Sequence, residues 1–147
     1  MDDDLLTLAR LARLLERACG DIEPPLTLAQ YRLLAMIGGG ADRASHLAGQ
    51  LALAKPTVSA TVDTLVERGL VERGAARDDR RVTTLSVTAA GHEVLAGAEG
   101  AMRSRLDDVL ARVDDPAAVA GALDALGNGL DERRSARRAA RAAKAGA

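Results

Sequence analysis

Residues 55–88, which read KPTVSATVDTLVERGLVERGAARDDRRVTTLSVT, constrain the fold more than any other stretch of the chain. Their first half places apolar residues at three- and four-residue spacing, which is the repeat of one helix face. Gly69 then separates this half from two short β-type segments that an arginine-rich turn connects. The stretch therefore predicts a helix followed by a β-hairpin. The apolar positions of the helix are Val58, Val62, Leu65 and Val66.

The other side of this predicted helix carries short and mostly polar side chains, so it can approach a second surface closely. The turn of the hairpin carries Arg77, Arg80 and Arg81, which cannot all be buried without partners. A slim helix beside a cationic hairpin indicates duplex DNA, with the helix in the major groove and the arginines on the backbone or in the minor groove. The short side chains are Thr57, Ser59, Ala60, Thr61 and Thr64.

The segment before this helix predicts a second, shorter helix. It opens at Asp42 or Arg43 and directs Leu47, Ala48 and Leu51 inward. Residues 52–54 make a tight turn, and Pro56 suits the first turn of the next helix because its missing N–H has no intrahelical partner there. A short helix, a tight turn and a second helix are the organisation of a helix-turn-helix motif.

Composition narrows the possible partners and compartment. The chain has no Phe or Trp and one Tyr, which argues against the aromatic stacking platforms that bind single-stranded nucleic acid. Its net charge of −1 means that DNA binding must rely on a local patch. One cysteine cannot form an internal disulfide, and the acidic start lacks the character of a signal peptide. We therefore expect a cytoplasmic protein.

Motifs for catalysis, metals or cofactors do not stand out. Cys19, His46 and His92 are too few and too scattered to specify a metal site. The triple glycine 38–40 is not followed by the Gly-Lys-Ser/Thr of a phosphate loop, so it predicts a turn. We expect neither an enzyme nor a cofactor.

From Leu26 to Gly91 the chain resembles the MarR family of winged helix-turn-helix transcriptional regulators. The matching segments are LTLAQYRLLAMI, HLAGQLALAKPTVSATVDTLVERGLVER and DDRRVTTLSVTAAG. The resemblance implies a homodimer that its first and last helices hold together and that binds a pseudo-palindromic operator. It also implies that the protein is a repressor released by a small, often aromatic, ligand or by cysteine oxidation.

The resemblance gives roles to individual residues. Lys55 and the helix N-terminus would meet phosphate, while Thr57, Ser59 and Thr61 would face base edges. Thr64 is expected on the same recognition surface. Ala60 stands where relatives often have an arginine, so fewer guanine contacts are expected. Arg81 matches the wing-tip arginine that enters the minor groove, and Asp79 matches the acid that orients it or pairs with a neighbouring arginine. Arg77 and Arg80 are then expected on the DNA backbone.

Three further features have competing interpretations. An effector pocket can lie where the first, second and fifth helices meet near the wing, lined by Tyr31, Met36 and His46. Cys19 can serve either oxidation sensing or simple packing, and packing is the more favoured role. The winged helix itself can serve protein–protein assembly without DNA contact, and the basic tail can contact phosphate or remain solvated.

The fold class expected is mainly α with a small β-hairpin wing, formed by a winged helix-turn-helix domain plus terminal dimerisation helices. The terminal helices carry more apolar surface than one small core can cover, so pairing across a two-fold axis would bury it. The expected parts are residues 1–25 (N-terminal dimerisation helix and connector), 26–91 (winged helix-turn-helix DNA-binding domain), 92–130 (long helix and C-terminal dimerisation helix) and 131–147 (basic, alanine-rich tail).

Overall fold

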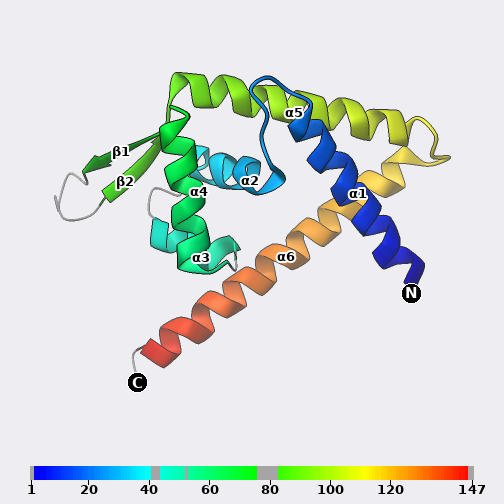
Figure 1. Ribbon diagram of the computed structural model, residues 1–147. Coiled ribbons are helices and arrows are strands. Elements are labelled where there is room, and N and C mark those ends of the chain that lie inside the picture. The colour runs from blue at the N-terminus through cyan, green and yellow to red at the C-terminus, as the bar shows by residue number, and fades with distance from the viewer. Residues whose placement is uncertain (1, 41–43, 52, 76–82, 146–147) are drawn as a thin grey trace. The chain divides into compact units, whose positions relative to one another are not determined.

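The structure is a computed structural model that describes residues 2–40, 44–51, 53–75 and 83–145 (Figure 1). It divides into two compact units, Met1–Asp107 and Asp108–Ala147. The expected fold class, mainly helical with a two-stranded antiparallel wing, is confirmed. The elements are α1 (Asp2–Gly20), α2 (Leu28–Gly38), α3 (Ala44–Leu51), α4 (Lys55–Glu67), β1 (Val71–Ala75), β2 (Thr83–Val87), α5 (Ala89–Leu110) and α6 (Pro116–Ala145).

Local signals in the sequence set the helix starts. Thr27 caps α2: its side chain accepts a hydrogen bond from the Gln30 N–H at 3.1 Å. The Gln30 side chain accepts one from the Thr27 N–H at 3.0 Å, which completes a capping box. At the start of α6, the Ala118 N–H donates to Asp115 Oδ1 at 3.0 Å. These bonds satisfy N–H groups that have no partner inside their helices.

The end of α4 fixes where the wing begins. Gly69 adopts φ +70°, a left-handed conformation that glycine accepts without a Cβ clash. The Leu70 N–H then reaches the Leu65 carbonyl at 2.9 Å, and the Gly69 N–H reaches the Val66 carbonyl at 2.9 Å. This pair of bonds is a Schellman motif, which reverses the chain directly into β1.

The hydrophobic core of the first unit is built around α2, α3 and α4. Leu34, Leu47 and Leu65 are fully buried, and Val58 and Val62 are 1 % and 2 % exposed. These positions include the inward faces predicted for the two helices of the helix-turn-helix. Because the apolar stripe of α4 faces this core, its opposite face points to solvent.

The wing is a β1–β2 hairpin whose strands pair from Val71↔Val87 to Ala75↔Thr83. Val71 and Leu85 are buried at its base, while the other described residues of the two strands are exposed or half-buried. Across the strands, Ser86 Oγ donates to Glu72 Oε1 at 3.1 Å. The base of the hairpin is thus anchored to the core.

The third helix is described from Ala44, and its expected start at Asp42 or Arg43 lies outside the described part of the chain. The fifth helix ends at Leu110. The basic segment that we separated as a tail belongs to α6, which runs unbroken to Ala145. Alanine and arginine have high helix propensities, so this segment is helical without an apolar stripe.

Candidate DNA-binding surface

The exposed face of α4 gathers the residues predicted to meet DNA. Lys55, Thr57, Ser59 and Ala60 are exposed, and Thr61 and Thr64 are half-buried at the margin of the face. On the opposite side the apolar stripe fixes the rotation of the helix in the core. Apart from Lys55 these side chains are short, so this side of the helix can approach a major groove closely. We call these six residues the α4 face.

Two threonines of this face already use their hydroxyl hydrogens. Thr61 Oγ1 donates to the Thr57 carbonyl at 2.9 Å, and Thr64 Oγ1 donates to the Ala60 carbonyl at 3.0 Å. Each hydroxyl oxygen can still accept a hydrogen bond, and each methyl group can contact a thymine methyl. In this conformation Thr61 and Thr64 can read only donors and methyl groups on the bases.

An ion pair that the sequence interpretation missed joins α4 to the wing. Arg73 on β1 pairs with Asp63 on the exposed side of α4, and both side chains are about half exposed. The pair bridges the two elements expected to contact DNA and so orients the hairpin beside the helix. Nothing in the local spacing of the sequence indicates this pair, because it depends on the turn at Gly69.

A second missed residue, Arg68, holds the C-terminal end of α4 in place. Its guanidinium donates to the Pro25 carbonyl at 2.6 Å and to Gln30 Oε1 at 3.2 Å. Gln30 also completes the capping box of α2. Arg68 thus links the end of α4 to the start of α2.

The arginine-rich turn of the wing falls outside the described residues. The candidate contacts there are Arg77, Asp79, Arg80 and Arg81. The strands that lead to this turn are described up to Ala75 and again from Thr83. The roles of these four residues therefore stay predictions.

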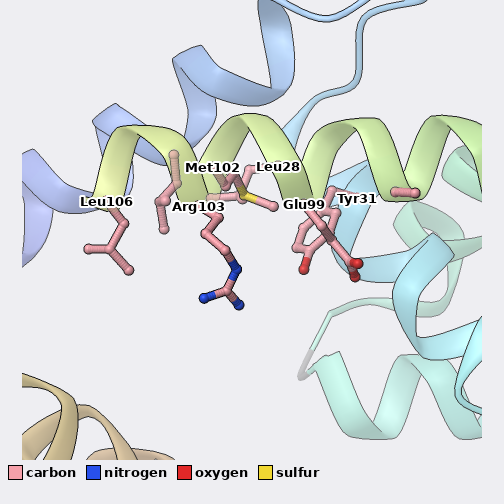
Figure 2. Close-up of a pocket in the computed structure, with 9 residues that line it drawn as sticks. Leu28, Tyr31, Glu99, Met102, Arg103 and Leu106 are labelled. Atoms are coloured by element: carbon pink, nitrogen blue, oxygen red, sulfur yellow. The ribbon is translucent and has the colours of Figure 1, made fainter. Parts of the chain in front are cut away.

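A separate open pocket of about 640 Å³ lies between α1, α2 and α5 (Figure 2). Leu15, Leu28, Met102 and Leu106 contribute apolar surface. Its polar groups are Tyr31, Glu99 and Arg103. Figure 2 shows Tyr31 and Glu99 near each other, with Arg103 further along α5.

Of the predicted pocket residues, Tyr31 is part of this lining and Met36 is not. Tyr31 lines the pocket; burial, followed by the nearby charge of Glu99, raises the pKa of its phenol. Met36 instead packs against the core as a partly buried side chain. The His46 side chain lies outside the described part of the structure.

Cys19 is part of the core. It is 0 % exposed, and its Sγ donates to Met102 Sδ at 3.5 Å. Burial raises the pKa of the thiol, which lowers the fraction of reactive thiolate. Both observations favour the packing role over oxidation sensing.

Two other features, a metal-binding cluster and a membrane-spanning helix, are not found among the described residues. No group of three or more His, Cys, Asp or Glu side chains there is arranged to hold a metal ion. Of the helices in the described ranges, none combines the length and the apolar character that crossing a bilayer requires.

Comparison with known proteins agrees with this fold. A sequence model described as the MarR family matches residues 25–82. RV1404 from Mycobacterium tuberculosis is 21 % identical with a TM-score of 0.77, over 87 % of this chain and 90 % of that one. CouR from Rhodococcus jostii RHA1 bound to p-coumaroyl-CoA is 22 % identical with a TM-score of 0.69, over 88 % and 92 %. No curated protein sequence gives a significant match.

The chain is also similar to a protein whose structure was solved in complex with DNA. It is a transcriptional repressor, CouR, bound to a 23-mer DNA duplex, 28 % identical with a TM-score of 0.69 over 84 % of this chain and 88 % of that one. The family match covers the helix-turn-helix and reaches into the wing, and the fold similarity extends over both sets of flanking helices. Residues 25–82 therefore match the MarR family, and the chain is a DNA-binding transcriptional regulator with the winged helix-turn-helix fold of that family.

Proposed function

We propose that this regulator is a homodimeric repressor that binds a pseudo-palindromic operator sequence-specifically in the cytoplasm. The observation that carries the proposal is the α4 face, which the buried stripe of the same helix holds outward beside the wing. In the proposed complex the α4 face enters the major groove. Arg81 enters the adjacent minor groove, while Arg77 and Arg80 contact backbone phosphates.

Exposed leucines support the homodimer. On α6, Leu123, Leu126 and Leu130 recur on one side of the helix and are 37 %, 55 % and 55 % exposed. On α1, Leu5 and Leu8 are 67 % and 50 % exposed. Contiguous exposed apolar side chains of this kind mark interaction surfaces. A second copy of the chain can cover them symmetrically, which places two α4 helices about one DNA turn apart, ~34 Å.

Release by a small effector fits the pocket between α1, α2 and α5. Its volume lies within the range of small-molecule sites, about 300–1,000 Å³. The apolar wall suits a hydrophobic body, and Arg103 offers a charge-assisted hydrogen bond to an anionic group. Because α5 begins at the base of the wing, a ligand here can bias the wing position. The effector proposed is a small amphipathic acid.

The effector is tested by thermal melting with a panel of aromatic acids and their coenzyme A thioesters. The panel includes p-coumaroyl-CoA, which the Rhodococcus jostii CouR structure contains. We expect one member to raise the melting temperature and to weaken DNA binding. The Arg103→Gln variant should lose both effects, and their retention in that variant would rule out this pocket.

The operator is tested by selecting bound duplexes from a random pool and then footprinting the protein on the selected duplexes. We expect two half-sites about one turn apart, with protection of the minor groove outside each half-site. Selection that yields no shared sequence, or a single unpaired half-site, would contradict the proposal.

An assembly module without DNA contact is the competing function. It predicts weak duplex binding with little salt dependence, since it neutralises no phosphates. The proposed regulator predicts affinity that falls steeply as salt rises, because each phosphate contact releases counterions. A salt series with one duplex separates the two.

A further inference from the structure

The second half of α6 carries a cationic side. Arg133, Arg134, Arg137, Arg138 and Lys144 are all exposed. At about 100° per residue, these five positions fall within an arc of roughly 140° around the helix axis. At about 1.5 Å per residue they extend along ~17 Å of the helix. No acidic residue follows Glu132, so this side is uniformly positive.

The basic side chains of this segment form few ion pairs among the described residues. Among the described residues, this segment makes one ion pair, between Arg134 Nη1 and Asp131 Oδ1 at 3.3 Å, and its side chains are 50 % and 72 % exposed. An exposed pair of this kind stabilises a helix by at most about 1 kcal/mol. It can therefore be exchanged for another anion at little cost.

The other side of the same segment identifies what kind of partner fits. It is formed by small side chains, among them Ala136, Ala139, Ala140 and Ala143. A helix that lies on a membrane surface buries large residues such as Leu, Phe or Trp, and this segment has none after Leu130. A protein partner that binds a helix likewise needs apolar anchors. Charge is the feature that this segment offers for recognition.

The distribution of charge over the chain points to the same partner. Residues 133–144 contain six basic residues, and the rest of the chain then has a formal charge of −7 against a total of −1. Arginine provides five of the six, and its planar guanidinium binds phosphate oxygens in a bidentate manner. The polyanion that a DNA-binding regulator meets is duplex DNA.

We propose that the basic half of α6 binds the phosphate backbone of duplex DNA, independently of sequence and in addition to the groove contacts of α4 and the wing. The proposal rests on the DNA-binding function proposed above. It assigns base selection to α4 and the wing and sequence-independent attraction to α6. The alanine-rich segment is helical by its own propensity, so it can present the cations without packing against the core.

The test uses two matched variants of the full chain. In one, Arg133, Arg134, Arg137 and Arg138 become Gln; in the other, the same four become Lys. Arginine, glutamine and lysine are all good helix formers, so α6 should persist in both variants, as circular dichroism will verify. Affinity is measured from low to physiological salt, both for the selected operator and for a mixed-sequence duplex of about 40 base pairs.

We expect the Gln variant to bind the mixed-sequence duplex at least tenfold more weakly at low salt. Its slope of log affinity against log salt should be shallower by about 0.9 for each lost phosphate contact, or ~2–4 in total. The ranking of operator sequences should not change, because the base contacts remain. The Lys variant should keep a slope close to that of the parent chain.

Three results would overturn the proposal. The Gln variant could keep the parent slope and affinity on the mixed-sequence duplex. It could lose dimer mass in solution, which would assign these arginines to subunit contacts. It could also bind DNA normally but lose binding to vesicles of anionic phospholipid, which would assign them to a membrane. Failure of the proposed operator binding is a separate result, because it would show as no sequence preference in the parent chain.

Discussion

At the scale of single residues, Thr88 and Gly91 connect the wing to α5. Thr88 Oγ1 donates to the Gly69 carbonyl at 2.6 Å and accepts from the Gly91 N–H at 3.0 Å. Gly91 packs so closely that an added Cβ would lie 2.1 Å from the Leu70 carbonyl oxygen and 2.7 Å from Val87 Cγ1. The position therefore requires glycine for close packing.

Replacing Gly91 by alanine should separate α5 from the base of the wing. A backbone carbonyl cannot rotate away as a side chain can, so we expect a loss of about 3 kcal/mol or more in the free energy of unfolding. Gly97 is the control, since a Cβ there meets nothing within 4 Å. Gly97→Ala should stabilise the helix by up to ~1 kcal/mol. Equal stability of the two variants in urea unfolding would contradict this packing.

Cys19 and Tyr31 make the stability depend on alkaline pH. Their ordinary pKa values are 9.0 and 10.0, and burial raises both in the folded chain. Above pH 9 the unfolded chain therefore releases protons that the folded chain retains, so the free energy of unfolding falls as pH rises; below pH 9 this contribution is constant. Cys19→Ala and Tyr31→Phe should each flatten the decline between pH 9 and 11, relative to the stability of the same variant at pH 7. An unchanged alkaline slope in both variants would contradict the burial effect.

At the scale of elements, α4 and the hairpin act as one unit because Arg73 and Asp63 join them. An exposed ion pair contributes little to folding, of the order of 1 kcal/mol or less. Under the proposed function its importance lies in position, because it joins the helix and the hairpin that are proposed to meet adjacent grooves.

A double-mutant cycle tests this orienting role. Asp63→Asn, Arg73→Gln and the double variant should each lower operator affinity by a similar amount, several-fold, while the melting temperature changes little. Equal losses in the single and double variants indicate that the two residues act together. If Asp63→Asn instead strengthened binding while Arg73→Gln weakened it, Arg73 would be contacting phosphate directly and the orienting role would be wrong.

Sequence periodicity predicted the elements well because their causes are local. The stripe containing Val58, Val62 and Leu65, the cap at Thr27 and the turn at Gly69 each depend on residues a few positions apart. The basic segment beyond Leu130 has no apolar stripe, so its periodicity leaves open whether the helix continues, whereas helix propensity alone is sufficient for α6 to reach Ala145.

The features that the sequence did not predict depend on tertiary proximity. Asp63 and Arg73 meet only because the chain reverses at Gly69. Glu99 and Arg103 join Tyr31 in one pocket only because α5 lies beside α2. Tyr31 was predicted as a pocket residue on the second helix, whereas the two charged residues resemble any solvated helix surface in the sequence.

At the scale of the whole molecule, the exposed leucines of α6 predict dimer assembly. Replacing Leu126 and Leu130 by lysine should cost a single chain little, because both side chains are 55 % exposed. In a dimer interface the same changes place charges where apolar contact is needed. Light scattering should then show a fall from twice the chain mass of 15.2 kDa to that of one chain.

The matched control for this experiment is Asn128→Lys, an exposed position on the opposite side of α6. It should leave the dimer mass unchanged. A double-leucine variant that stays dimeric would exclude this face from the interface, and a parent chain of monomer mass would remove the homodimer from the proposed function.

Recognition of duplex DNA through the α4 face is tested most directly by titrating the selected operator with the Ala60→Glu variant. Ala60 is exposed, so the new carboxylate should not disturb folding, but it would face the negative backbone and the acceptor-rich groove. We predict at least a hundredfold loss of affinity, about 2.7 kcal/mol, with an unchanged melting temperature. Asn128→Glu, which adds the same charge on α6, should bind nearly as tightly as the parent chain. Ala60→Glu binding with parental affinity at matched salt would show that the α4 face does not contact DNA.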